Sequence, residues 1–130
     1  AGFDYSTLQL EDLLLKAGLK KEDHNKKLSS YSKGMRQKVG IAIALSKNAD
    51  YIFMDEPISG LDPKAAIEFT QICKELSQEG KGVFMATHDI FNAVNVGTRI
   101  GIMKEGELVH ITDTASINAN ELQEIYLKTI

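Results

Sequence analysis

The sequence has no tryptophan, one cysteine and two prolines among its 130 residues. A lone cysteine cannot form an internal disulfide, which excludes the small secreted domains that disulfides hold together. No apolar run approaches the roughly 18 residues of a membrane-spanning helix, and the first residues lack the pattern of a secretory signal. The net charge of −3 is too small, and of the wrong sign, to indicate binding to nucleic acid through bulk charge. We therefore expect no nucleic-acid partner.

What is present is ordinary for a globular protein. Hydrophobic residues make up 43% of the chain and charged residues 25%, which excludes collagen-like and wholly disordered chains. The length suits one domain with its own core. Composition thus predicts a soluble, intracellular, single-domain chain and leaves its chemistry open.

Two helices are expected in the first part of the chain. Ser6 and Gln9 have the spacing of a capping box, and the apolar positions that follow end at Gly18. A second helix is predicted over residues 32–47, where apolar side chains recur at helical spacing. Its later half is apolar on nearly all sides, which predicts burial.

The middle of the chain has the pattern of a βαβ unit. Residues 51–54 and 82–87 are short apolar runs typical of buried parallel strands. Between them, Asp62 and Pro63 predict the start of a helix that Gly80 closes. The order strand, helix, strand predicts an α/β fold with a parallel sheet.

The last part is expected to hold smaller elements. Asp89 is a candidate cap for a short helix that Gly97 ends. Residues 99–103 and 107–111 flank a turn that contains glycine, which predicts a β-hairpin. A final amphipathic helix is expected over residues 121–127.

Ionisable residues follow both predicted parallel strands. Asp55 and Glu56 end the first strand, and His88 follows the second. Ligands of open α/β sheets bind at the carboxyl ends of strands, so one shared site is expected there. Two adjacent carboxylates suit phosphate transfer, because one can hold Mg²⁺ while the other polarises an attacking water. The alternative is that these residues merely end the strand in solvent.

Four motifs occur together and in a fixed order. They are Tyr-Ser-Lys-Gly-Met-Arg-Gln-Lys at residues 31–38, Tyr-Ile-Phe-Met-Asp-Glu-Pro at 51–57, Ser-Gly-Leu-Asp-Pro at 59–63 and Ala-Thr-His-Asp at 86–89. The set resembles the signature motif, Walker B strand, D-loop and H-loop of the ATP-binding cassette (ABC) ATPases. Any one of these motifs would be a weak signal, whereas the joint match is specific.

The resemblance assigns roles to single residues. It implies that Asp55 is the Mg²⁺ partner through a water, that Glu56 is the general base for the attacking water, and that His88 contacts the γ-phosphate and orients that water. It also implies that residues 59–62 cross to a second cassette.

The signature motif is expected to bind ATP held by that second cassette. Ser32 and the backbone N–H groups of Lys33, Gly34 and Met35 open a helix, and the amino end of a helix suits an anion. The resemblance adds Asp62 to these ATP contacts. The common family signature is Leu-Ser-Gly-Gly-Gln, from which this sequence departs at Tyr31, Lys33 and Met35. This form of the signature resembles that of the bacterial exporter branch of the family.

The P-loop is missing. A P-loop consists of Gly, any four residues, Gly-Lys, and then Ser or Thr. This pattern occurs nowhere in the chain, and the family's Gln loop is missing too. The chain thus resembles the C-terminal half of a cassette, a partial P-loop NTPase fold. Residues 1–48 correspond to part of the helical subdomain, and residues 49–130 to the second half of the catalytic core with its hairpin.

This absence predicts how the chain by itself would behave. The P-loop strand of related ATPases would lie beside the strand that precedes His88, so its absence is expected to leave an open sheet edge. We expect the chain alone to self-associate and to have negligible ATPase activity.

The function implied by the resemblance is that of the ATP-binding subunit of an ABC transporter, and its implied partners are a second cassette and a multi-pass membrane permease. ATP and Mg²⁺ are its implied cofactors, and its implied location is cytoplasmic, peripheral at the inner face of the cell membrane. Two alternatives stay open. One is an ABC-type ATPase without a permease, of the translation-factor or DNA-repair type, and the other is a non-catalytic half-cassette that serves as an interaction module.

Overall fold

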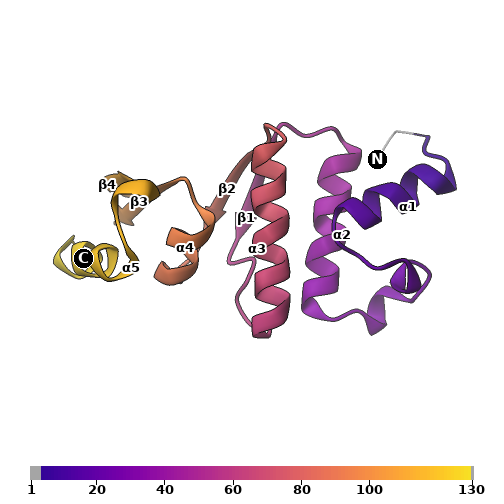
Figure 1. Ribbon diagram of the computed structural model, residues 1–130, viewed down its shortest axis with the longest axis horizontal. Helices are drawn as coiled ribbons and strands as arrows, with labels where there is room; N and C mark the ends of the chain where they lie inside the picture. The colour runs from indigo at the N-terminus through magenta and orange to yellow at the C-terminus, as the bar shows by residue number, and fades with distance from the viewer. Residues whose placement is uncertain (1–3, 130) are drawn as a thin grey trace. The chain divides into compact units, whose positions relative to one another are not determined.

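The computed structural model describes residues 4–129 (Figure 1). The chain forms two compact units, Ala1–Ala86 and Thr87–Ile130, and each has its own arrangement. The first unit contains the parallel strands and the longer helices, and the second contains the hairpin.

The first unit begins with two capped helices. Helix α1 spans Thr7–Lys16, and the predicted capping box between Ser6 and Gln9 is present. Two short 3-10 turns, Lys21–Asp23 and Leu28–Ser30, lie in the charged stretch that follows. Helix α2 spans Lys33–Ser46, with Ser32 as its N-cap. Both helices are therefore confirmed.

The predicted βαβ unit is also confirmed. Strands β1 (Tyr51–Asp55) and β2 (Gly82–Ala86) pair in parallel, and helix α3 (Pro63–Gln78) connects them. The Asp62 carboxylate accepts a hydrogen bond from the Ala65 N–H at 3.0 Å, and Pro63 begins α3, as the sequence predicts.

The core of the first unit lies around α3, which contacts the sheet through β2 and also contacts α2 (Figure 1). The buried apolar residues of α3 are Phe69, Ile72, Cys73 and Leu76. From the sheet, Ile52 is 7% exposed. Burial raises the pKa of the Cys73 thiol to about 11, so this thiol is a packing group and a poor nucleophile at neutral pH.

The expectation that both strands are fully buried is wrong. The side chains of Tyr51, Phe53 and Phe84 are 74%, 76% and 63% exposed, because α3 covers one face of the sheet only. The rings of Phe53 and Phe84 lie 5.6 Å apart between centroids on the open face. We call these three side chains the aromatic face. Continuous apolar character is typical of strands covered on both sides, and within residues 4–129 the second cover is absent.

Helix α2 is likewise buried on fewer sides than its sequence predicts. Ile41 and Ala42 are buried, whereas Ile43 is 50% exposed. The apolar side chains on all sides of α2 and those of the aromatic face therefore have one property in common. In both places, part of the apolar surface is left uncovered by the other elements of the first unit.

The second unit consists of helix α4 (Ile90–Val96), strands β3 (Arg99–Lys104) and β4 (Glu107–Asp113), and helix α5 (Ala119–Thr129). The strands form the predicted antiparallel hairpin. Both residues of its turn, Glu105 and Gly106, have positive φ, as a two-residue hairpin turn of the primed type requires.

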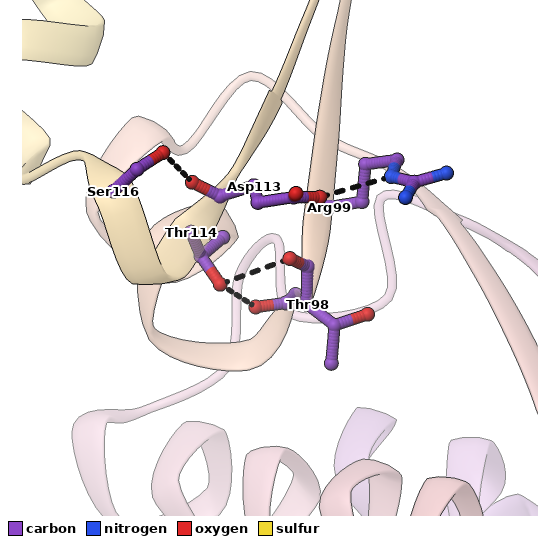
Figure 2. A network of polar contacts seen from close by, with 6 residues as sticks. Thr98, Arg99, Asp113, Thr114 and Ser116 are labelled. Atoms are coloured by element: carbon purple, nitrogen blue, oxygen red, sulfur yellow. Dashed lines mark hydrogen bonds and ion pairs between the residues drawn. The ribbon is translucent and has the colours of Figure 1, made fainter.

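A network of polar contacts closes the base of the hairpin (Figure 2). The Thr114 hydroxyl lies 2.7 Å from the Gly97 carbonyl oxygen and 3.2 Å from that of Thr98. The Arg99 guanidinium donates to the Asp113 carboxylate at 3.0 Å. These contacts fix the register where β3 begins and β4 ends.

Among the described helices, none combines the length and the apolar character needed to cross a membrane.

The aromatic face offers a testable cause for the self-association that we expect of the chain. The paired change Phe53→Ser and Phe84→Ser should lower the average mass of the 130-residue chain in light scattering at high concentration, because it removes exposed apolar area. Phe91→Ser is the matched control, since Phe91 is similarly exposed at 64% and lies in the second unit. A monomeric wild-type chain under these conditions would contradict the expectation.

Candidate functional site

The carboxyl end of β1 presents the two predicted carboxylates. Asp55 ends the strand with its side chain exposed to solvent. Glu56 follows in the left-handed region with a φ of 44°, and its N–H donates to the Ala86 carbonyl at 2.9 Å. The end of β2 thus fixes the backbone of Glu56 at the edge of the sheet. The sequence pattern carried no signal for this conformation, which non-glycine residues seldom adopt.

A tight loop leads from Glu56 to α3. Two backbone bonds stabilise it, from the Ser59 N–H to the Glu56 carbonyl at 3.2 Å and from the Leu61 N–H to the Ile58 carbonyl at 3.1 Å. Gly60 has a φ of 71°, which glycine adopts without steric cost. We call residues 57–62 the connecting loop, and it includes the residues that resemble the D-loop.

The amino end of α2 has the properties of an anion site. The Ser32 hydroxyl accepts a hydrogen bond from the Met35 N–H at 3.2 Å. The other N–H groups of a first helical turn have no carbonyl acceptor within the helix, and the helix dipole places partial positive charge there. Ser32 is exposed, so an approaching phosphate can reach this end.

Side chains outside the predicted set hold this helix end in place. Tyr31 is buried, and its hydroxyl donates to the Asp23 carbonyl at 2.5 Å. The Arg36 guanidinium donates to the Tyr31 carbonyl. The sequence singled out Tyr31 only as a departure from the common signature. Its buried ring and anchored hydroxyl show that it attaches the signature motif to the preceding charged stretch.

The structure brings the signature motif and the connecting loop together within the first unit. The Lys33 ammonium donates to the Ser59 carbonyl. Gly34 is buried, and a Cβ built on it would lie 3.5 Å from both the Ala65 Cβ and the Leu61 Cδ2. A side chain longer than a methyl group at residue 34 would displace the amino ends of α2 and α3 from each other.

A cavity of about 180 Å³ lies beside this helix end and includes Ser32 and Met35 in its lining. Lys38 and Glu68 also line it, and they form an ion pair at 2.7 Å that links α2 to α3. The hydrogen bond from Lys38, reinforced by the Lys38 charge, holds the pKa of Glu68 below its ordinary value of 4.5. Sequence patterning alone offered no signal for this pair, since its partners lie 30 residues apart.

His88 belongs to the second unit and is exposed, two residues after β2 ends. It directly precedes Asp89, whose carboxylate caps α4 by accepting from the Asn92 N–H at 2.9 Å. The role of His88 beside Glu56 stays a prediction.

The described residues contain no cluster of three or more metal-ligating side chains. Mg²⁺ is commonly held by one or two carboxylates together with waters and substrate phosphates. The exposed carboxylate of Asp55 at a strand end fits that kind of site, in which it would be one ligand among several.

Comparisons with known proteins find ATP-binding proteins of ABC transporters. The ABC transporter family profile matches residues 5–59. The oligopeptide transport ATP-binding protein OppF of Bacillus subtilis is 34% identical over 123 residues, which are 94% of this chain and 40% of OppF. The arginine transport ATP-binding protein ArtM of the same organism is 41% identical over 101 residues, 76% of this chain and 41% of ArtM.

A solved structure gives the same result. The ATP-binding cassette MJ0796, determined as a dimer in a post-hydrolysis state with ADP and phosphate, is 31% identical, with a TM-score of 0.71 over 88% of this chain and 51% of MJ0796. The fold is therefore part of the α/β P-loop NTPase fold found in ATP-binding cassettes. The family match, the relatives and the solved cassette together support an ABC transporter ATPase domain, with part of which this chain aligns.

The chain spans 29–41% of the length of the curated relatives that it matches, and about half of the solved cassettes. The similarity therefore extends over only part of each of these proteins.

The ion pair between α2 and α3 predicts a pH-dependent contribution to stability. Because the pKa of Glu68 is lowered in the folded chain, its carboxylate stabilises the fold above its unfolded pKa, and this contribution is lost as the pH falls through the lower, folded value. Glu68→Gln should reduce the free energy of unfolding by about 0.5 kcal/mol near neutral pH, a small effect because the pair is partly exposed.

Urea unfolding near neutral pH and at about pH 3 checks this difference, which should vanish in acid. Lys38→Met serves as the paired variant, because the two changes together should cost less than the sum of each alone. An equal loss at both pH values would show that Glu68 acts through packing and not through its charge.

Proposed function

We propose that this chain is the C-terminal part of the ATP-binding subunit of an ABC transporter, which couples hydrolysis of Mg-ATP to transport. The observation that carries the proposal is the position of the Ser32 helix end. It is exposed, has donors for an anion, and contacts the connecting loop that leads back to Asp55 and Glu56. A proposed phosphate-binding surface and a carboxylate site are thus joined within the first unit by the Lys33–Ser59 contact.

The chain's own residues supply half of a hydrolysis site. Glu56, fixed by the end of β2, is the general base that accepts a proton from the attacking water. His88 orients that water against the γ-phosphate. Asp55 would hold Mg²⁺, which would neutralise charge on the phosphates.

The signature motif acts on a different nucleotide. Ser32 and the backbone N–H groups of Lys33 and Gly34, joined by that of Met35 when it exchanges the Ser32 hydroxyl for the phosphate, bind the γ-phosphate of ATP held by a second cassette, and Asp62 approaches the same nucleotide. The dimeric assembly of MJ0796 supports a two-cassette arrangement for this chain as well. In the complete protein, two ATP molecules would lie between the two cassettes.

The remaining partner is a multi-pass membrane permease, which places the subunit in the cytoplasm at the inner face of the membrane. The names of the relatives include transport of oligopeptides and of arginine, so their similarity indicates shared machinery and no particular cargo. The Tyr-Ser-Lys-Gly-Met form of the signature supports a place among bacterial exporters.

Replacing the proposed base tests the hydrolytic part of this function. In the full-length protein, Glu56→Gln should lower kcat for ATP at least about 100-fold, because an amide cannot accept the proton. Steady-state phosphate release measures the effect. Glu107→Gln is the control, because Glu107 is an exposed carboxylate in β4 of the second unit. Unchanged turnover in Glu56→Gln would remove Glu56 from the mechanism.

The 130-residue chain by itself should show negligible ATPase activity, because it contains no P-loop to cradle the phosphates. The same phosphate-release assay checks this expectation. Turnover by the chain alone that Glu56→Gln abolishes would contradict it.

A further inference from the structure

Lys33 is the first residue of α2 and its side chain is exposed, yet it has a defined partner. Its ammonium donates to the backbone carbonyl of Ser59, in the connecting loop. A Cβ built on Gly60 would lie 3.5 Å from the Lys33 Nζ, so the ammonium lies against the turn itself. One side chain thus joins two segments that are 26 residues apart.

Helix stability does not account for a lysine at this position. The first turn of a helix carries partial positive charge, and a cation there is unfavourable. The helix already has its N-cap in Ser32 and a further anchor in the Arg36 bond to the Tyr31 carbonyl. The contact with Ser59 is the favourable interaction that the lysine gains, since a charged donor strengthens a hydrogen bond to a carbonyl.

The connecting loop has little else to fix its centre. Ser59 and Gly60 are exposed, and the loop's own backbone bonds span three residues each. Gly60 is in the left-handed region, and because glycine has no side chain, its backbone is less restricted than that of any other residue. The start of the loop, Pro57 and Ile58, is buried, but its exposed centre is held by short-range bonds and opens more easily, so one charge-assisted bond from outside has a large relative effect there.

We infer that Lys33 is a positioning residue whose backbone and side chain have separate roles. Its backbone N–H belongs to the anion site, whereas its side chain holds the connecting loop in register with that site through the Ser59 carbonyl. The signature motif and the loop that returns to Glu56 then move as one body. The activity readout for this inference rests on the proposed function, and the structural readout does not.

Amide hydrogen exchange of the full-length protein without nucleotide tests the structural part. Lys33→Met keeps the length of the side chain and removes the donor, so the Ser59 and Leu61 N–H groups should exchange about fivefold faster, the effect of losing one such bond. Lys33→Arg retains a charged donor and should restore exchange to within about twofold of wild type. Lys27→Met is the control, since Lys27 is exposed and its side chain has no bond among the described residues.

ATP hydrolysis by the same variants tests the functional part. Lys33→Met should lower kcat about threefold to tenfold with KM for ATP changed less than about twofold, because misplacement of the loop affects the reacting geometry more than nucleotide capture. Lys33→Arg should recover most of kcat. Lys27→Met should match wild type.

Two results would overturn the inference. Unchanged exchange at Ser59 and Leu61 in Lys33→Met would show that the side chain does not hold the loop. A raised KM with unchanged loop exchange would make the side chain a phosphate contact instead. If the full-length protein proved to have no ATPase activity, the proposed function would fail while hydrogen exchange still decided the role of Lys33.

Discussion

The close approach of the amino ends of α2 and α3 is the constraint on which the candidate site depends. It is possible because residue 34 is glycine, with Leu61 and Ala65 at van der Waals distance from the place where a Cβ would lie. The Lys38–Glu68 ion pair holds the two helices together further along their length. Through this contact, the anion-binding end of α2 and the loop that follows Glu56 share one framework.

Local sequence signals predicted most of the fold. Ser6, Ser32 and Asp62 each begin a helix where a short polar side chain precedes an apolar periodic segment, and all three accept the expected N–H bonds. The hairpin followed from its glycine-containing turn. Such signals act over a few residues, so they remain visible in the sequence.

Burial and the support of the site could not be predicted in the same way. The apolar strands suggested cover on both faces, but the exposure of Phe53 depends on which elements lie beside it, and strand composition does not specify that. The left-handed φ of Glu56 depends on a bond from the end of β2, and the Lys33 contact spans 26 residues. The types of the site residues were visible in their motifs, whereas their tertiary partners were not.

The burial of Cys73 has a practical consequence. The chain contains no second cysteine. Cys73 lies on the buried face of α3, and its thiol stays protonated at neutral pH. A cysteine introduced at an exposed position would therefore be the one thiolate that a labelling reagent meets. The 130-residue chain is thus already suited to carrying a spectroscopic probe on the connecting loop, without prior removal of its own thiol.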